Sequence, residues 1–425
     1  MLSEISRGGK CLFRMRILMK KRLLLFPGQG NVYVGMGKDI CQKYSVARDT
    51  FDEACDVLQM DLKKLCFSGE LSDLIPTEIA QPAILASSIA AFRVLSERMD
   101  LHPHYFAGHS LGEFSALTAA GVLKYSDALK LVRRRGELMR DAAQNQNGVM
   151  SAIGKVPLYM IQEVCSKITK ENHTVVVSNY NSPKQNVISG NMDAVSEAEN
   201  ELIRFGAFVK RLDVSAPFHS PLMQPAVGEF KTFLEKIAFE DPRRVLSNVT
   251  AKEHSADMLV ENLAKQLVSP VRWAETMEYT ETLGIRLAID IGPKDVMKKL
   301  VIQNYRSVKA LAVDNSDDLI ELEKIIQYDA PIPFVSRCTG IAVATKNLCT
   351  DENLYEEDVV RPYEELRQLS LAVEREDRNA TMDEMKHAID LLIRILTAKK
   401  VPQEEQEQCL QRLYLDTETE MLFAE

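Results

Sequence analysis

The sequence lacks the signatures of a metal site, a disulfide scaffold and a membrane span. It has no CxxC pair, and none of its eight cysteines stands at a zinc-site spacing from a histidine. Thiols spread through a chain of this size favour a reducing compartment. No apolar run approaches the roughly 18 residues that cross a bilayer. The 425 residues, 46% hydrophobic and 27% charged, instead predict a globular protein of two or three domains.

The excess of acidic side chains is confined to the C-terminal end of the chain. The net charge is −9, but residues 351–425 alone hold 20 acidic and 9 basic side chains. The rest of the chain is therefore close to neutral. This balance argues against a nucleic-acid partner and mildly favours anionic substrates or partners.

Residues 1–22 are basic, with seven lysines and arginines and one acidic residue. One interpretation is a transit peptide, which would place the protein in the mitochondrial matrix. The other is a start at Met19, so that MKKRLLLFPGQG opens on the first strand of a cytoplasmic protein. We expect the second, and residues 1–21 are then an N-terminal extension.

Short apolar runs alternate with longer helical patterns over the first part of the chain. Residues 22–26 (RLLLF) form a continuous apolar run ended by a Pro-Gly pair, which is typical of a strand buried on both faces. Helical patterns follow over 78–98 and 126–143, with a short strand between them that ends near Gly108. This alternation predicts a parallel sheet covered by helices.

The order of elements changes after residue 143. Strand, helix, two strands, helix and strand follow one another, which predicts an inserted ferredoxin-like unit. The α/β alternation then resumes, and beyond it a mostly irregular stretch (PIPFVSRCTGIAVATKN) precedes a charged, largely helical region. The predicted fold class is therefore α/β. Its parts are an N-terminal extension (1–21), an α/β domain (22–143 and 213–328), a ferredoxin-like subdomain (144–212) and an acidic, mostly helical C-terminal extension (329–425).

The segment GHSLG at 108–112 has the GxSxG pattern, and it falls where strand, tight turn and helix are expected. Small neighbours allow a sharp turn that presents the Ser110 hydroxyl at a helix start, where free N–H groups can face an oxyanion. The pattern alone is weak, because α/β-hydrolases and ordinary glycine-flanked helix starts share it. It makes Ser110 a candidate nucleophile.

A base for this serine must be sought among seven histidines. His219 stands in SAPFHSPLM, where Ser220 can cap a helix and Pro221 can occupy its first turn. The positive end of the helix dipole would then hold the imidazole neutral. An inert loop histidine is the alternative. His109 is expected to shape the turn, and surface or packing positions are expected for His102, His104, His173, His254 and His387.

An arginine gives a third signal. Arg135 falls about 60° from Val132 around the predicted helix, at the edge of its apolar stripe, whereas Arg133 and Arg134 point away. A buried arginine is costly unless an anion meets it. Exposure of its charged end to solvent, or pairing with a structural carboxylate, is the alternative.

Six motifs occur in a fixed order: FPGQG (26–30), GHSLGEFSAL (108–117), RRRGELM (133–139), SNYNSP (178–183), PFHSPLM (217–223) and AKQLVSPVRW (264–273). Through them, residues 22–325 closely resemble malonyl-CoA:acyl carrier protein transacylases and the related acyltransferases of polyketide synthases. The resemblance implies an α/β hydrolase-like core with the ferredoxin-like unit as a lid. Residues 330–425 lie outside it.

The resemblance also implies catalytic roles. Ser110 would be acylated, and His219 would be its base. A main-chain carbonyl, that of Gln266, would orient the histidine in place of a triad carboxylate. The N–H groups of Gln29 and Leu111 would form the oxyanion hole.

On the substrate side, the resemblance implies that Arg135 pairs with a malonyl carboxylate. Phe218 resembles the malonyl-selecting pattern, and Asn179 and Asn181 match positions near the cleft. The implied reaction transfers malonyl from malonyl-CoA to the phosphopantetheine thiol of holo acyl carrier protein, for fatty acid or polyketide synthesis. No metal or cofactor is implied.

Two other functions remain open at the level of the sequence. One is a thioester hydrolase acting on acyl carrier protein, although clearing monocarboxylic acyl chains needs no carboxylate-binding arginine. The other is a non-catalytic subunit that docks on carrier proteins through its acidic tail. We expect neither a nucleic-acid nor a membrane partner.

Overall fold

The computed structural model describes residues 21–144, 147–214, 216–305, 307–329, 333–376, 378–417, 419 and 422–423. By the density of its internal contacts the chain divides into two compact units. The first ends at Tyr328 and the second begins at Asp329. Both interpretations of the basic N-terminal segment concern residues that lie outside the described part of the chain.

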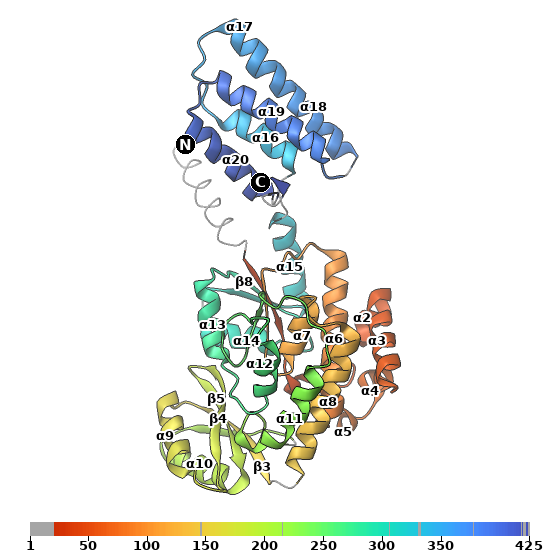
Figure 1. Cartoon of the computed structure of the whole chain (residues 1–425), viewed down its shortest axis with the longest axis vertical. Helices are drawn as coiled ribbons and strands as arrows, with labels where there is room; N and C mark the ends of the chain where they lie inside the picture. Colours follow the sequence, from red (N-terminus) through yellow and green to blue (C-terminus); the bar gives the residue numbers. More distant parts are fainter. Residues whose placement is uncertain are drawn as a thin grey trace. The chain divides into compact units, whose positions relative to one another are not determined.

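A five-stranded parallel sheet forms the centre of the first unit (Figure 1). Its strands, in spatial order, are β7 (Val245–Leu246), β2 (Tyr105–Gly108), β1 (Arg22–Phe26), β8 (Leu287–Asp290) and β9 (Lys309–Ala312). Every residue of the central strand β1 is buried. This is the pattern that a continuous apolar run predicts for a parallel sheet with both faces covered.

The alternation of side chains along β1 divides the core of the first unit into two layers. Leu24 and Phe26 belong to one hydrophobic cluster, and Leu23 and Leu25 belong to another on the opposite face. The helices that contribute to the first cluster are α2 (Lys38–Lys43), α3 (Ser45–Leu58), α4 (Leu62–Ser68), α5 (Leu71–Leu74), α6 (Thr77–Arg98), α7 (Gly112–Ala119), α8 (Tyr125–Ala143), α11 (Gln224–Leu234), α12 (Leu259–Lys265) and α15 (Ser316–Asp329). The second cluster contains α13 (Trp273–Thr282) and α14 (Val296–Asn304).

Helix α6 is the one helix in the described ranges that is long and apolar enough to cross a membrane by length and composition. Its most apolar window is 72% buried inside the protein. It packs against α3, α7 and α8. Its apolar character is therefore that of a central core helix.

A separate four-stranded antiparallel sheet is inserted between α8 and the rest of the first unit. The chain runs through β3 (Gly148–Gly154), α9 (Leu158–Ile168), β4 (Val175–Ser182), β5 (Gln185–Asn191), α10 (Met192–Arg204) and β6 (Phe208–Arg211). The strands lie in the order β4-β5-β3-β6, and α9 and α10 share a hydrophobic cluster with them. The order of elements is the one that the sequence predicts.

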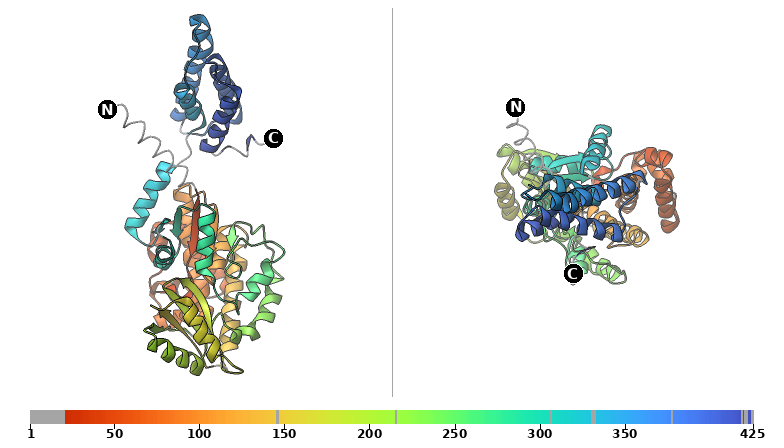
Figure 2. Two further views of the ribbon diagram at one scale, coloured as in Figure 1. Left: turned by 90° about the vertical axis from the view of Figure 1, so that its left-hand side faces the viewer. Right: turned by 90° about the horizontal axis from the view of Figure 1, so that it is seen from above.

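The second unit consists of helices (Figure 2). These helices share a hydrophobic core of their own. They are α16 (Phe334–Ala344), α17 (Glu352–Tyr355), the five-residue π-helix η3 (Glu356–Val360), α18 (Arg361–Arg375), α19 (Met382–Ala398) and α20 (Gln403–Thr417). A capping box formed by Thr381 and Glu384 begins α19.

The prediction of a mostly irregular stretch after residue 330 is wrong, because α16 occupies most of it. The apolar residues of this helix recur at helical spacing: Phe334, Cys338 and Ile341 are all buried in the core of the second unit. Burial of this face offsets the weak intrinsic helix propensity of its glycine, valines and isoleucine.

Candidate active site

The turn that carries Ser110 lies between β2 and α7. Ser110 has a backbone φ of 52°, a left-handed value that is strained for a residue with a side chain. Both flanking glycines are required by close packing. A Cβ at Gly108 would lie 1.8 Å from the Gly112 carbonyl carbon, and one at Gly112 would lie 2.1 Å from the Phe26 carbonyl oxygen.

Ser110 and His219 form a hydrogen-bonded pair. The Ser110 Oγ lies 2.7 Å from His219 Nε2, and His219 Nδ1 lies 2.9 Å from the main-chain oxygen of Gln266. Since a carbonyl oxygen only accepts, Nδ1 carries the ring proton and Nε2 faces the serine as an acceptor. The pair thus has the geometry of a nucleophile and its general base, oriented by a main-chain carbonyl.

The neutral state of His219 has a different main cause from the one that the sequence suggested. The ring is 3% exposed, and burial, followed by the positive charge of Arg135, lowers its pKa to about 3. The expected side-chain cap by Ser220 is absent, because its hydroxyl donates instead to the Pro217 carbonyl at 2.6 Å. The helical segment that follows, η2 (Pro221–Met223), is a single 3₁₀ turn.

Arg135 lies inside the protein rather than at the edge of a buried stripe, with 1% of its surface exposed. Its guanidinium donates to Gln81 Oε1 at 2.9 Å, to Gln266 Oε1 at 2.8 Å and to Ser110 Oγ at 3.2 Å. Its Nε has no hydrogen-bond partner among the described residues. Burial lowers its pKa from 12.5 to about 10, so the side chain stays charged at neutral pH.

None of the ion pairs between described residues includes Arg135. Its neighbours on α8 differ in this respect, because Arg133 pairs with Glu137, and Arg134 pairs with Glu137 and Glu229. Arg135 is therefore a buried cation, 3.2 Å from the candidate nucleophile, without a carboxylate bound to it.

A cleft of about 480 Å³ opens over Ser110, His219 and Arg135. The antiparallel sheet forms one wall with side chains from β3, β4 and β5, and α14 adds apolar residues. Four more of the predicted residues line this cleft, namely Gln29, Phe218, Asn179 and Asn181. Asn181 Oδ1 accepts a hydrogen bond of 2.8 Å from His109 Nε2, and Asn179 Oδ1 accepts one of 2.8 Å from the Ser178 hydroxyl.

Gln29 begins the short 3₁₀ turn η1 (Gln29–Asn31), and Leu111 directly follows the nucleophile candidate. The main-chain N–H groups of these two residues make no hydrogen bond to the described part of the chain. The side chain of Gln29 is held by Thr77, whose hydroxyl donates to it at 2.8 Å. The arrangement leaves two main-chain donors available beside the serine.

Several residues around the site were missed at the level of the sequence. His254, expected at a surface or packing position, is 1% exposed and bonds to the buried Glu113, a partner that the sequence did not suggest. Asn248 accepts from the Ser110 N–H at 2.6 Å and donates to the Gly108 carbonyl at 2.7 Å. No local pattern marks these residues, because their partners lie more than a hundred positions away in the sequence.

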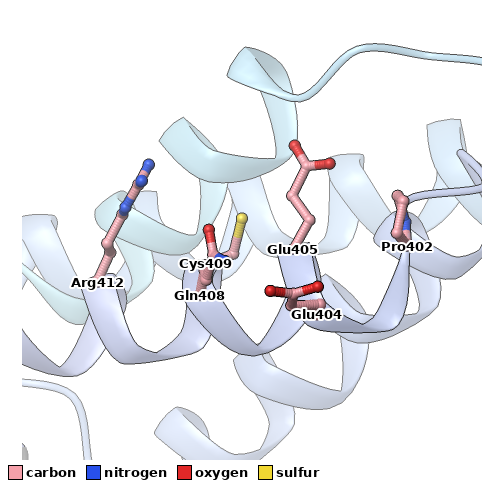
Figure 3. Close-up of a pocket in the computed structure, with 6 residues that line it drawn as sticks. All are labelled: Pro402, Glu404, Glu405, Gln408, Cys409 and Arg412. Carbon is pink, nitrogen blue, oxygen red and sulfur yellow. The ribbon is translucent and has the colours of Figure 1, made fainter.

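A second hollow of about 400 Å³ lies in the helical unit along α20 (Figure 3). Its lining residues are Pro402, Glu404, Glu405, Gln408, Cys409 and Arg412. Burial and the charge of Glu405 raise the pKa of the Cys409 thiol, which keeps it protonated. The hollow therefore lacks the activated nucleophile that the cleft holds. Within the described ranges, no group of three or more histidine, cysteine or acidic side chains could hold a metal ion.

A serine on a sharp strand-to-helix turn, a neutral histidine and two free main-chain donors form a site suited to acyl transfer. The comparison with protein families agrees. Residues 23–320 match the acyl transferase domain family, and the chain belongs to this family.

Within it, the chain belongs with the malonyl CoA-acyl carrier protein transacylases. It is 37% identical to one from Bacillus subtilis over 395 residues, which cover 91% of this chain and 99% of that protein. It is 36% identical to the one from Escherichia coli K12, over 70% of this chain and 96% of that protein.

Solved structures share the fold of the first unit. FabD from Acinetobacter baumannii is 35% identical, with a TM-score of 0.70, and the match covers 73% of this chain and all of that one. A malonyl-transacylase solved in complex with a type II PKS acyl-carrier protein is 37% identical, with a TM-score of 0.69 over 72% of this chain and 100% of that one. The α/β fold with a parallel sheet and a separate antiparallel sheet is thus the fold of these enzymes.

Proposed function

We propose that the protein transfers a malonyl group from malonyl-CoA to the phosphopantetheine thiol of holo acyl carrier protein through a malonyl ester of Ser110. The observation that carries this proposal is the buried guanidinium of Arg135, 3.2 Å from Ser110 Oγ and without a carboxylate partner among the described residues. A malonyl thioester supplies the missing carboxylate two bonds from the carbonyl that the serine attacks. The names of the relatives, all malonyl CoA-acyl carrier protein transacylases, support the same substrate.

Loading begins with His219 as the base. Its Nε2 takes the proton of Ser110 as Oγ bonds to the thioester carbonyl carbon, and the carbonyl oxygen becomes an oxyanion. The main-chain N–H groups of Gln29 and Leu111 are the donors for this oxyanion. The C–S bond then breaks, and the proton on His219 passes to the coenzyme A thiolate.

Transfer repeats these steps in reverse order. The carrier-protein thiol gives its proton to His219 and attacks the malonyl ester, and Ser110 leaves with the proton returned. No metal or cofactor takes part. The antiparallel sheet, which we interpret as a ferredoxin-like lid on an α/β hydrolase-like core, forms one wall of the cleft and limits the access of water to the ester.

The other cleft residues bind the acyl chain and its carboxylate. Phe218 is buried at the cleft wall next to His219, where it limits the room beside the malonyl methylene. Asn179 and Asn181 offer side-chain amides from β4 toward the same cleft. Gln266 orients His219 through its main-chain oxygen.

Carrier protein and malonyl-CoA are thus the partners, and we place the reaction in the cytoplasm. The carrier protein serves fatty acid or polyketide synthesis. Loading of purified carrier proteins of both kinds identifies the one that this enzyme serves, by the larger kcat/KM.

Radiolabelled malonyl-CoA tests the proposal. We expect a stable label on the wild-type protein, lost in Ser110→Ala, that moves to carrier protein when it is added. Rapid release of the label as malonate would instead show a hydrolase. A protein that takes no label would be a docking subunit without this activity.

A further inference from the structure

A buried carboxylate lies directly beneath the nucleophile turn. Glu113 is the second residue of α7 and is 0% exposed. Its Oε1 accepts from His254 Nε2 at 2.6 Å, and its Oε2 accepts from the Asn248 N–H at 3.1 Å and from Gln266 Nε2 at 2.6 Å. Three residues that follow Glu113 by more than 130 positions therefore converge on its carboxylate.

Gln266 connects this carboxylate to the cleft. Its side-chain NH₂ donates both hydrogens, one to Glu113 and one to the Ser110 carbonyl at 3.1 Å. Its Oε1 is left to accept from Arg135 at 2.8 Å. The reverse orientation of the amide would set its NH₂ against a guanidinium and its oxygen against a carboxylate and a carbonyl. Glu113 thus fixes which end of the amide Arg135 meets.

We propose that Glu113 is a positioning residue that holds Arg135 ready for the substrate carboxylate by fixing the side-chain amide of Gln266. This inference rests on the proposed function. It assigns to Glu113 a role in the preference for a carboxylated acyl group, beyond the serine, histidine and arginine already described.

The route through an amide has a chemical consequence. A carboxylate paired directly with Arg135 would occupy the N–H groups that a bound malonyl group needs. Glu113 instead accepts hydrogen bonds from His254, Asn248 and Gln266. It is linked to Arg135 only through the neutral amide of Gln266. The arginine is oriented, and its charge stays available to an incoming anion.

The chain offers variants that separate this role from general packing. Gln266→Met removes the amide bridge but keeps the main-chain oxygen that His219 needs. Glu113→Ala removes the carboxylate. Glu113→Gln keeps the shape, can accept from Gln266 and Asn248, and can donate to His254, whose Nδ1 has no partner among the described residues and is free to take the ring proton.

The measurement is kcat/KM for formation of the Ser110 ester from malonyl-CoA and from acetyl-CoA, followed by intact-protein mass spectrometry on the full chain. Loss of one hydrogen bond to a charged group should lower kcat/KM by roughly 10- to 100-fold. We expect Gln266→Met and Glu113→Ala to lower the malonyl-over-acetyl ratio by this factor. We expect Glu113→Gln to stay within about threefold of the wild-type ratio.

A double-mutant cycle provides the control. In an Arg135→Ala background, Gln266→Met and Glu113→Ala should leave the ratio unchanged, because the group that they position is gone. The proposal is overturned if the variants slow both substrates equally, if Glu113→Gln behaves like Glu113→Ala, or if the ratio shifts equally in both backgrounds. If Glu113→Ala does not fold, Gln266→Met alone decides. A wild-type protein that forms no malonyl ester would overturn the proposed function itself.

Discussion

The α/β unit and the helical unit bury their charged groups in different ways. In the α/β unit, Arg135 and Glu113 are both inside the protein, and neither is bonded directly to the other. In the helical unit, the buried Lys399 donates to the carbonyls of Ala342 and Thr345, which end α16. The second arrangement uses a charge to complete a helix end. In the α/β unit, Arg135 is buried without a carboxylate from the described residues bound to it, so its charge can meet an incoming anion. Burying a charge in this way costs free energy, and such a cost is typical of a binding site.

The relatives differ in whether they also match the helical unit. The Escherichia coli enzyme is matched over 96% of its length by 70% of this chain, so it has no counterpart of the helical unit. The Bacillus subtilis relative matches 91% of this chain, which is more than residues 1–328 make up, so the similarity extends into the helical unit. We infer that the chemistry belongs to the first unit and that the second is an addition shared with this Bacillus subtilis relative.

The largest effect is expected at the nucleophile. Ser110→Ala should lower malonyl loading and transfer by roughly a thousandfold or more, because no other described hydroxyl is paired with His219. The circular dichroism spectrum and the melting temperature should stay close to wild type. A labelled acyl-enzyme in this variant would contradict the assignment and would move the nucleophile elsewhere in the molecule.

The second largest effect is expected at Arg135, the buried arginine that has no carboxylate partner among the described residues. Arg135→Ala should slow malonyl loading by roughly 30-fold to several thousandfold, while acetyl loading persists or rises, since removal of one partner of a charge-assisted pair costs about 2–5 kcal/mol. Arg135→Lys should fall between, because a point charge cannot replace the planar fork. The quantity to measure is kcat/KM with both substrates.

Arg134→Ala is the matched control for this comparison. Arg134 is the neighbour of Arg135 on α8 but pairs with Glu137 and Glu229 at the surface. It should leave the malonyl-over-acetyl preference unchanged. Equal losses with both substrates in Arg135→Ala would mean that this arginine serves general positioning, and the choice of malonyl would lose its main support.

A smaller effect is expected from pH. Because burial and Arg135 lower the pKa of His219 from 6.5 to about 3, the free enzyme should show no acid limb in kcat/KM near pH 6.5. A bound malonyl carboxylate offsets the charge of Arg135, so the acid limb in kcat should lie at higher pH than the limb in kcat/KM. Loading rates between pH 4 and 8 measure both, and a limb in kcat/KM centred near 6.5 would contradict this prediction.

The same shift has a consequence for stability. The unfolded chain binds a proton at His219 near pH 6.5, whereas the folded protein binds it only near 3. This histidine therefore contributes its full stabilisation above pH 6.5, and the contribution is lost as pH falls from 6.5 toward 3. His219→Gln should reduce the slope of the free energy of unfolding against pH in this window, as measured by urea titrations.

Much of the fold follows from local pattern. The apolar run at 22–26 predicts the central strand, and the succession of runs between 144 and 212 predicts the inserted elements in the order in which they occur. Helix α16 was missed because its glycine and β-branched residues disfavour a helix locally. Only its packing in the helical unit stabilises it, and packing is not a local property.

The candidate site, like the fold, could be predicted from the sequence only in part. Ser110 and Arg135 stand in patterns that point to a sharp turn and to a helix face, and His219 stands at a loop-to-helix junction. The parts that the sequence did not reveal are those whose meaning depends on distant partners. Glu113 and His254 are 141 residues apart, and no spacing rule relates them. The residues that we propose to contact the substrate are therefore easier to find in the sequence than the residues that hold them in place.

The smallest effect on loading is expected from removal of the helical unit. Its core is separate from those of the α/β unit, and the residues that line the cleft all lie between Gly28 and Leu300. A chain that ends at residue 328 should therefore load malonyl on Ser110 within about twofold of the full chain, measured as kcat/KM.

Leu392→Ala makes the same comparison in the full chain, because a cavity at this buried position should destabilise the helical unit by about 2–5 kcal/mol without changing loading. Normal loading together with weaker transfer to one carrier protein would assign the helical unit to partner recognition. An inactive or insoluble truncation, with slower loading in Leu392→Ala, would show instead that the chemistry depends on both units.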